Sequence, residues 1–390
     1  MKSIKNLNNI ENKSVILRLD LNVPIKKGEI TDTNRIDKVI PTIKYLLEKK
    51  AKIIIISHVG RPKGKIINEL SLELVALCIK DRIKKEVSLL KENIFNLNKE
   101  NIFKYSSDQV ILLENIRFYP EEEANNDEFS KKLAGLGEIY VNDAFSCSHR
   151  NHASVSKITK YLPSYSGLQI TAEVNALNKI TNEIKRPVTC IIGGSKISSK
   201  INVIKNLIPK FNNIIIVGAM ANNIFKYKGL NVGNSIYEKN MDNIIKEMFK
   251  YANNNKCKIY FPKDVKVGKK LSDKSIEKEL DEIEVDDMIL DVGSKTIVEI
   301  KEIIDNSSTI LWNGPLGFFE NEHFSLGSLE VAKYIADKGN KIYSVVGGGD
   351  TVSVINSLNI ECKFNFVSTA GGAFLEYLEG KVLPGIKALM

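Results

Sequence analysis

The sequence predicts an α/β protein of two domains, each built on a parallel β-sheet. A chain of 390 residues is too long for one ordinary core and indicates two to three domains. Short apolar segments typical of buried strands alternate with amphipathic helical segments through both halves. The loops after the strands carry Arg and His in the first half and Gly in the second. This asymmetry indicates two domains that hold different ligands.

Composition narrows the class of protein. A hydrophobic share of 43% and a charged share of 26% are typical of a soluble globular chain. Residues 1–13 contain no apolar leader, and the longest aliphatic runs are too short to cross a bilayer, so we expect a cytoplasmic protein with no membrane partner. The cysteines are odd in number, lack C-x-x-C spacing and are predicted to be reduced: Cys78, Cys147, Cys190, Cys257 and Cys362.

The first half contains four predicted strands separated by helical patterns. The strands cover residues 14–19, 53–57, 109–113 and 139–142. One helix begins at Arg35 and a second covers residues 71–84; the apolar face of the first consists of Ile36, Val39, Ile40, Ile43 and Leu47. In open parallel sheets, ligands bind beyond the carboxyl ends of the strands. The polar loops after these strands should therefore share one edge.

Arginine is scarce in this lysine-rich chain, so its placement is informative. Of 56 basic residues, seven are arginine: Arg18, Arg35, Arg61, Arg82, Arg117, Arg150 and Arg186. The planar guanidinium group binds carboxylate and phosphate with paired hydrogen bonds that lysine cannot reproduce. Taken singly, such residues are more often caps or surface ion pairs. Their recurrence at strand ends predicts a site for a small, multiply charged anion, called here the anion cup: Arg35, Arg61, Arg117, Arg150, His58, His149 and His152.

The middle of the chain predicts a phosphate site. Residues 188–192 form a strand pattern, Gly193, Gly194 and Ser195 a tight turn, and residues 196–208 a helix. Bare backbone N–H groups and a helix N-terminus suit an anion, and Lys196 and Lys200 would stand one helical turn apart. The alternative is a chain reversal followed by two solvated lysines. The pattern is neither a P-loop nor the G-x-G-x-x-G of a dinucleotide fold.

The second half repeats the alternation and ends its strands in glycines. A helix over residues 171–184 links the halves and stops before Pro187. Strands are predicted over residues 213–217, 258–261, 288–291, 309–312, 341–346 and 364–367, with a helix over 242–252. Glycine-containing turns follow at residues 218–219, 313–317, 347–350 and 371–372. Glycine lets backbone approach a ligand closely, so these turns indicate a nucleotide surface.

With these loops in view, the sequence resembles the phosphoglycerate kinase family over nearly its whole length. Six motifs match in order and at the family's spacing: Arg18-Leu-Asp-Leu-Asn-Val-Pro24, Ser57-His-Val-Gly-Arg-Pro62, Glu114-Asn-Ile-Arg-Phe118, Trp312-Asn-Gly-Pro315, Gly347-Gly-Gly-Asp-Thr351 and Leu378-Glu-Gly-Lys-Val-Leu-Pro-Gly385. Any one could arise by chance, whereas six in order make the match specific.

The resemblance implies a domain layout and a reaction. It implies two Rossmann-like parallel-sheet domains separated by a cleft and joined by a helix: residues 1–170, the linking helix 171–186, residues 187–367, and a segment 368–390 that returns to the first domain. It also implies reversible phosphoryl transfer from 1,3-bisphosphoglycerate to MgADP, giving 3-phosphoglycerate and MgATP, by a phosphotransferase that acts on a carboxyl group. A monomer with only these small-molecule partners is expected.

The resemblance also implies roles for individual residues. The phosphoglycerate ligands would be Asp20, Asn22, Arg35, His58, Arg61, Arg117 and Arg150. The nucleotide would contact Gly194, Lys196, Lys200, Gly218, Asn313, Pro315, Glu320, Gly347, Gly348, Gly349, Asp350 and Thr351. Asp350 would hold Mg²⁺, and Glu320 would meet the ribose hydroxyls. Arg35, Lys196, Gly371 and Gly372 would act on the transferring phosphoryl group.

The chain departs from the family's pattern at several positions. Val217, Gly218 and Ala219, followed by Asn222 and Asn223, stand where three glycines are often found. Elsewhere, Ser199 replaces a common Asp, and Ser146 and Ala370 replace common glycines. None of these removes a charged group to which chemistry is assigned, although the missing Asp alters the surroundings of Lys200.

Three other functions are weighed against this one. The net charge of +9 permits a nucleic-acid-binding protein, but the lysines are spread throughout and no binding motif appears. A nicotinamide dehydrogenase shares the α/β pattern but requires the missing G-x-G-x-x-G. A protein of related fold that has lost catalysis stays open.

Overall fold

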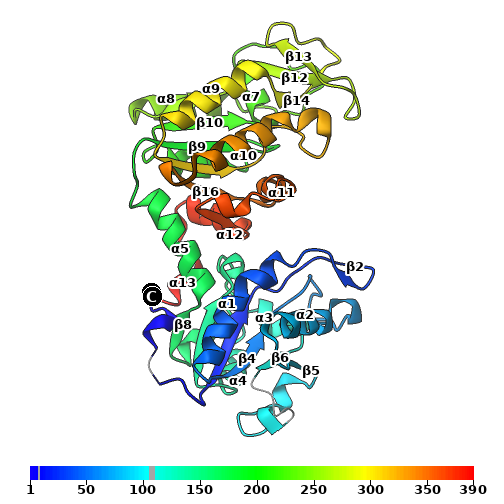
Figure 1. Ribbon diagram of the computed structural model, residues 1–390, viewed down its shortest axis with the longest axis vertical. Coiled ribbons are helices and arrows are strands. Elements are labelled where there is room, and N and C mark those ends of the chain that lie inside the picture. The colour runs from blue at the N-terminus through cyan, green and yellow to red at the C-terminus, as the bar shows by residue number, and fades with distance from the viewer. Residues whose placement is uncertain (8, 105–109) are drawn as a thin grey trace. The chain divides into compact units, whose positions relative to one another are not determined.

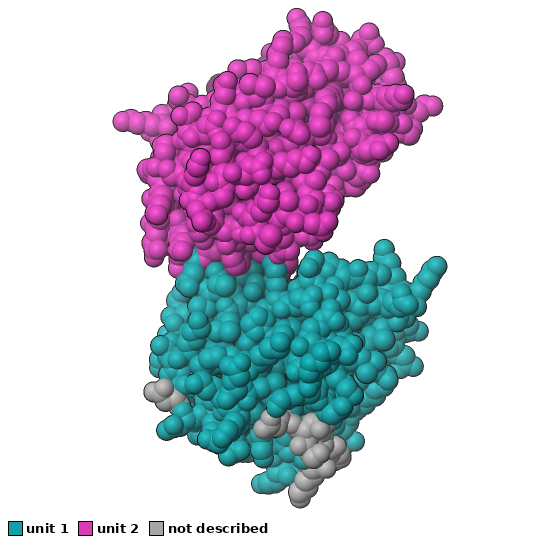
Figure 2. Space-filling model, viewed as in Figure 1, with its two compact units in different colours: residues 1–175, 382–390 teal, residues 176–381 magenta. Residues whose placement is uncertain are grey.

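The computed structural model describes residues 1–7, 9–104 and 110–390, which form two compact units. Unit 1 comprises Met1–Asn175 together with Val382–Met390, and unit 2 comprises Ala176–Lys381. Figure 2 shows the two units in separate colours. No helix in the described part of the chain is long and apolar enough to cross a membrane.

Unit 1 is built on a six-stranded parallel sheet of order β5-β6-β4-β1-β7-β8 (Figure 1). The strands are β1 (Ser14–Leu19), β4 (Lys52–Ile56), β5 (Ser88–Leu90), β6 (Val110–Leu113), β7 (Ile139–Asp143) and β8 (Ser164–Ser166). A small hairpin, β2 (Ile25–Lys26) with β3 (Glu29–Ile30), lies outside this sheet. The predicted strand 109–113 agrees from Val110 onward, while Gln109 lies outside the described residues.

The central strands of unit 1 are apolar along their whole length because both faces of the sheet are covered. Alternate residues enter different cores: Val15 and Leu17 pack with one cluster, Ile16 with the other. The first cluster includes apolar side chains of α1 (Asn34–Glu48) and α2 (Glu73–Ile83), and the second includes those of α4 (Asp127–Ala134). Short α3 (Pro120–Glu123) precedes α4. Near the end of α1, the leucine that faces the core is Leu46, which is fully buried, whereas the predicted Leu47 is only half-buried.

Unit 2 contains a second six-stranded parallel sheet, of order β11-β10-β9-β15-β16-β17. Its strands are β9 (Val188–Gly193), β10 (Asn213–Val217), β11 (Lys258–Tyr260), β15 (Thr309–Asn313), β16 (Tyr343–Gly347) and β17 (Phe366–Ser368). Its helices are α6 (Ile201–Leu207), α7 (Ala219–Tyr227), α8 (Asp242–Asn254), α9 (Ser294–Asp305), α10 (Leu326–Lys338), α11 (Gly349–Ser357) and α12 (Gly372–Leu378). Trp312 is fully buried within the core that α9, α10 and α11 form with this sheet. The predicted α/β fold with two large parallel sheets is confirmed.

One predicted strand of unit 2 belongs to a different sheet. Residues 288–291 were expected to continue the α/β alternation, but β14 (Met288–Val292) pairs antiparallel with β12 (Asp264–Gly268). The third strand of this small sheet is β13 (Ile276–Glu279), also antiparallel to β12. Val265 and Val267 of β12 are buried in a local cluster with Phe225 of α7. A local apolar core, rather than the main sheet, therefore accounts for the apolar pattern of this region.

The helix expected over residues 196–208 begins later than predicted. Residues 198–200 form a turn in which Lys200 N donates to Ile197 O at 3.0 Å, and α6 begins at Ile201 with Lys200 as its N-cap. Lys196 and Lys200 are thus not one turn apart on a helix. Ile197 is buried although it precedes the helix, which explains why its apolar side chain suggested an earlier start.

Two segments connect the units in sequence. Helix α5 (Leu168–Thr181) begins within unit 1 and ends within unit 2. Near the other end of the chain, residues 368–381 belong to unit 2, whereas Val382–Met390 belongs to unit 1. There, α13 (Pro384–Lys387) is fixed by Gly385 N, which donates to Ser148 O at 2.8 Å.

Candidate functional site

The anion cup of unit 1 begins with Asp20, the residue after β1. Its Oδ1 accepts a hydrogen bond from Asn22 N at 3.1 Å, and its Oδ2 accepts one from Arg35 Nη1 at 2.8 Å. Ser146 Oγ donates to the same Oδ2. Arg35 lies on α1 and Ser146 on the 3₁₀ helix η6 (Phe145–Cys147) after β7. One buried carboxylate therefore ties together the loops after two neighbouring strands and the start of a helix.

The loop after β4 joins the same assembly through Gly60. Gly60 N donates to Asn22 Oδ1 at 2.8 Å, and Gly60 O accepts from Arg117 Nη1 at 2.8 Å. Arg117 is buried, and within the described residues neither its Nε nor its Nη2 has a hydrogen-bond partner. Glu123 Oε1 lies 3.4 Å from Nε as an ion pair. Burial lowers the pKa of Arg117, yet the group stays cationic, so these donors without a hydrogen-bond partner suit an anionic ligand.

His58 is buried beside a second arginine. Its Nδ1 lies 3.2 Å from Arg18 Nη2, and because guanidinium nitrogens are donors only, Nδ1 accepts this hydrogen bond. Arg18 is itself fixed by Ser154 Oγ, which accepts from Nε at 2.9 Å. Burial first, and then the positive charges of Arg18, Arg117, Arg150 and Arg35, hold the pKa of His58 well below its usual value. The imidazole is therefore neutral near pH 7, with its proton on Nε2.

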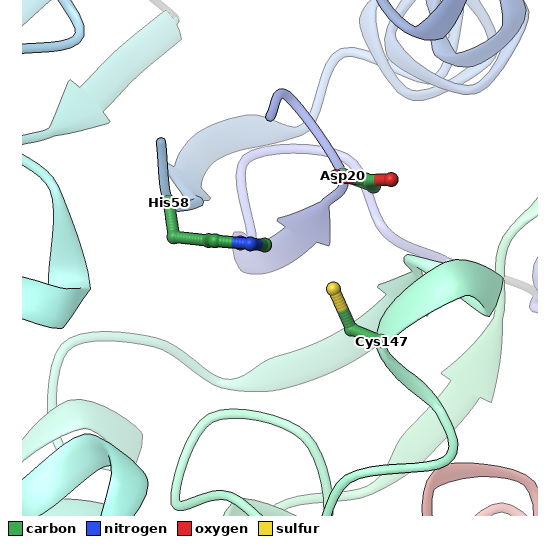
Figure 3. Close-up of side chains that lie close together, drawn as sticks. All are labelled: Asp20, His58 and Cys147. Atoms are coloured by element: carbon green, nitrogen blue, oxygen red, sulfur yellow. The ribbon is translucent and has the colours of Figure 1, made fainter. Parts of the chain in front are cut away.

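Asp20, His58 and Cys147 lie close enough to suggest a metal site (Figure 3). One ligand atom of each lies within 4.8 Å of the others, and all three side chains are buried. Arg18 Nη2 lies 3.9 Å from Cys147 Sγ as well as beside His58, and Arg35 is paired with Asp20. Burial raises the pKa of the Cys147 thiol, which favours the neutral form over the thiolate that binds metals. Each of the three side chains already contacts a guanidinium group, so the chemistry favours an anion over a metal cation.

The remaining predicted residues of the cup differ in placement. Arg150 is half-buried, and its charge contributes to lowering the pKa of both His58 and His152. Burial, followed by Arg117, Arg18 and Arg150, lowers the pKa of His152 to about 4. His149 is half-buried next to Arg150 in sequence. Arg61 is exposed in the loop after β4 and forms no hydrogen bond or ion pair with the described part of the chain.

Beneath the cup lies a buried network that the sequence analysis missed. Glu122 is fully buried and accepts from Ser154 N at 2.8 Å and from Ser154 Oγ at 2.6 Å. Burial raises the pKa of Glu122. Because Ser154 Oγ also accepts from Arg18, the network sets the position of the guanidinium that contacts His58. Arg18 stands in a strand pattern and Ser154 in a polar loop, so only their pairing in space identifies them.

Unit 2 contains a pocket of about 360 Å³ at the ends of its strands. Among the predicted nucleotide residues, its lining includes Gly194, Gly218, Pro315, Glu320 and Asp350. These residues follow β9, β10, β15 and β16, so successive strand ends converge as expected. Backbone crowding explains one of the glycines: a Cβ at Gly314 would lie 2.3 Å from Gly193 O. The rest of the lining is largely apolar and includes Phe225, Ile236 and Phe319.

A second group of predicted residues forms a hydrogen-bonded cluster that does not line the pocket. Lys200 Nζ donates to Asn313 Oδ1, and Asn313 Nδ2 donates to Gly347 O at 2.7 Å. Thr351 Oγ1 accepts from Gly314 N at 2.6 Å. Gly348 has φ +99°, and a Cβ there would lie 2.7 Å from Asn313 Nδ2. Burial lowers the pKa of Lys200.

Four predicted residues stand apart from these contacts. Lys196 is exposed, and its side chain forms no hydrogen bond or ion pair within the described chain, although its backbone O accepts from Ser199 Oγ at 2.7 Å. Gly349 is exposed in the first turn of α11. Gly371 caps α12 with φ +55°, and Gly372 begins that helix.

Asp350 has the exposure, position and free carboxylate that a magnesium ligand needs. It is exposed in the first turn of α11 and lines the pocket, and its side chain makes no hydrogen bond or ion pair with the described residues. A free carboxylate next to the glycine turn 347–349 suits Mg²⁺, which takes one or two protein carboxylates and completes its shell with water and phosphate oxygen.

These observations define a class: a two-unit α/β protein with an arginine-rich anion cup in one unit and a glycine-lined pocket in the other. Comparison with known proteins identifies the family. The family model for phosphoglycerate kinase matches residues 4–381. A phosphoglycerate kinase of Wolbachia pipientis wMel is 44% identical, covering 99% of this chain and 98% of its own. One of Chelativorans sp. (strain BNC1) is 43% identical, covering 100% and 98%.

Solved structures agree. The phosphoglycerate kinase of Coxiella burnetii aligns with a TM-score of 0.90 at 37% identity, covering 99% of this chain and 98% of its own. The enzyme of Pyrococcus horikoshii OT3 aligns with a TM-score of 0.82 at 30% identity, covering 100% and 98%. The chain belongs to the phosphoglycerate kinase family.

Proposed function

We propose that this chain catalyses reversible phosphoryl transfer from 1,3-bisphosphoglycerate to ADP, giving 3-phosphoglycerate and ATP in glycolysis and gluconeogenesis. Family membership along residues 4–381 is the observation that carries the proposal. The two ligand sites described above supply the charges that such substrates require. As a chain with small-molecule substrates, it is proposed to act as a cytoplasmic monomer without nucleic-acid or membrane partners.

The anion cup is the proposed phosphoglycerate site. Arg117 supports this role because its Nε and Nη2 are buried without a hydrogen-bond partner in the described structure. A carboxylate or phosphate oxygen would satisfy these donors. Neutral His58 would donate through Nε2, and the proposed ligands are completed by Asp20, Asn22, Arg35, Arg61 and Arg150. Arg35 is partly held by Asp20, which limits its motion before substrate arrives.

The pocket of unit 2 and the adjoining cluster are the proposed nucleotide site. Gly194, Gly218 and Pro315 would contact the nucleotide along the pocket wall, and Glu320 the ribose hydroxyls. The ammonium groups of Lys196 and Lys200 would meet the phosphates, with Asn313 positioning Lys200. The turn from Gly347 to Thr351 would approach with bare backbone N–H groups.

Asp350 is the proposed magnesium ligand. Bound Mg²⁺ would supply positive charge to the phosphates. The carboxylate side chain of Asp350 would hold it without first breaking a hydrogen bond within the protein.

The chemistry needs positioning and charge rather than a base. The carboxylate of 3-phosphoglycerate is already ionised near pH 7, because such groups have a pKa of about 4. The proposed donors to the transferring phosphoryl are Arg35 of unit 1 and Lys196, Gly371 and Gly372 of unit 2. Water must be excluded during transfer, since it would hydrolyse the acyl phosphate.

A coupled assay tests the proposal. Purified protein is mixed with 3-phosphoglycerate and MgATP, and ADP release is followed by NADH oxidation. The expected result is ADP formation that depends on phosphoglycerate. The absence of such turnover in a folded preparation would favour a member of the family that has lost catalysis.

A further inference from the structure

The pocket of unit 2 is mostly apolar, so its few polar side chains decide which bases it accepts. Two of them are already committed to the protein. Ser235 Oγ accepts from Ile289 N at 2.8 Å, and Asp291 Oδ2 accepts from Gly327 N at 2.8 Å. The other oxygen of Asp291, Oδ1, also has no hydrogen-bond partner in the described structure, but glycine backbone encloses it: a Cβ at Gly317 or Gly327 would lie 2.5 Å from Oδ1.

Asn222 is different. This residue of α7 lines the pocket, its side chain is fully buried, and its Oδ1 has no hydrogen-bond partner within the described structure. Unsatisfied buried acceptors are rare in native proteins and call for a partner, which a bound ligand can provide. Oδ1 can only accept a hydrogen bond, so the ligand group that matches it must be a donor.

The orientation of this amide is fixed by its other end. Asn222 Nδ2 donates to Ile236 O at 2.9 Å, and Ile236 also lines the pocket. Exchange of the two amide groups would place Oδ1 against a carbonyl and lose this bond. The acceptor therefore stays an acceptor whatever base is offered, which is the property that discrimination requires.

We infer that Asn222 is a specificity-determining residue that accepts a hydrogen bond from the exocyclic amino group of the nucleobase. This inference rests on the proposed nucleotide function of the pocket. Adenine carries an amino group at C6, whereas hypoxanthine carries a carbonyl oxygen at the same position. A hypoxanthine oxygen would face Oδ1 as one acceptor against another, so inosine nucleotides are rejected relative to adenine nucleotides.

The chain offers a matched control in the next residue. Asn223 is also buried, and its Nδ2 donates to Glu238 O at 2.7 Å. Its Oδ1 accepts from Glu238 N at 3.4 Å, and it is not part of the pocket lining. Asn222→Ala loses one hydrogen bond from α7 to the segment 236–238 and Asn223→Ala loses two, but only Asn222→Ala removes an unpaired acceptor from a residue that lines the pocket.

The test compares kcat/KM for ATP and for ITP, both with saturating 3-phosphoglycerate. The wild-type ratio should favour ATP and fall on the order of tenfold in Asn222→Ala, mainly through ATP, while Asn223→Ala keeps it. An unchanged ratio in folded Asn222→Ala would overturn the inference.

A binding measurement on the wild-type protein tests the role of Asn222 even if the variants do not fold or the chain has no turnover. Calorimetric titration of the wild-type protein with ADP and with IDP requires no catalysis and no substitution. The inference predicts tighter binding of ADP, and equal affinities would overturn it. Loss of phosphoglycerate-dependent turnover alongside a clear ADP preference would instead contradict the proposed function alone.

Discussion

Arg150 is the residue of the cup for which geometry and charge matter separately. It is half-buried in the segment after β7, close enough to His58 and His152 to lower the pKa of each. Arg150→Lys keeps the charge but loses the planar pair of donors. We expect a roughly tenfold or greater rise in KM for phosphoglycerate with little change in ADP affinity, measured by steady-state kinetics and calorimetry.

The control for this substitution is Arg186→Lys. Arg186 belongs to unit 2, is exposed and contacts Asn212 Oδ1 at 3.0 Å, outside both proposed sites. Arg186→Lys should leave the binding of phosphoglycerate and of ADP unchanged. Equal losses of phosphoglycerate and ADP binding in Arg150→Lys would argue against a cup dedicated to phosphoglycerate.

His152 links the cup to the pH dependence of stability. Its pKa is about 4 in the folded protein, lowered by burial and by neighbouring arginines, against about 6.5 when unfolded. Between these values the unfolded chain binds more protons, so the His152 contribution to stability is complete above pH 6.5 and is lost as the pH falls toward 4. His152→Gln removes this loss. The Tm of His152→Gln minus that of the wild type should increase as the pH falls from 7 to 5. A constant difference would contradict the lowered pKa of His152.

At the residue scale, the charged side chains that follow strands could be predicted from the sequence. Hydrogen bonds between residues far apart in the sequence could not. Arg35, His58 and Arg117 were selected because scarce residue types recur after strands. The role of Arg18 beside His58 could not be predicted because Arg18 lies inside a strand pattern. Its partner, Ser154, lies 136 positions later in the sequence. Lys196 and Lys200 were paired by helical spacing, but the turn before α6 separates their surroundings: Lys196 is exposed and Lys200 contacts Asn313.

At the element scale, the start of α11 depends on a glycine that other residues cannot replace. Gly348→Ala places a Cβ at φ +99° and 2.7 Å from Asn313 Nδ2, which displaces either the turn or the amide beside Lys200. Such strained positions cost about 1–3 kcal/mol. We expect ADP affinity to fall on the order of tenfold with phosphoglycerate affinity preserved, as measured by calorimetry.

Gly339→Ala separates strain from position. Gly339 caps α10 with φ +51°, and an added Cβ there meets no atom within 4 Å. This variant should lose thermal stability but keep ADP affinity. If both variants bound ADP like the wild type, the turn before α11 would have no part in the nucleotide site.

Element boundaries were predictable where the apolar pattern was regular. β1 and β10 coincide with their predicted ranges, and in β1 alternate positions enter two separate cores. The predicted helix 196–208 begins before the observed α6 because Ile197 is buried although it precedes the helix. The antiparallel pairing of β14 could not be predicted, since its apolar pattern is the same in either sheet and the difference depends on β12.

At the scale of the whole molecule, we expect turnover to require a divalent cation. Asp350 is a free carboxylate at the pocket, and phosphate and carboxylate oxygen together suit Mg²⁺. Excess EDTA should abolish phosphoglycerate-dependent ADP release, and added Mg²⁺ should restore it. Asp350→Asn should raise the Mg²⁺ concentration needed for half-maximal rate. Full activity in EDTA would contradict this part of the account.

In the reverse direction, the chain joins the phosphoryl group of ATP to the carboxylate of 3-phosphoglycerate. The acyl phosphate product can be trapped with hydroxylamine as a hydroxamate, which identifies the new bond directly. We expect hydroxamate formation that requires ATP, 3-phosphoglycerate and the protein together, matched by ADP release. Release of inorganic phosphate from ATP without hydroxamate, or no reaction in a folded preparation, would contradict it.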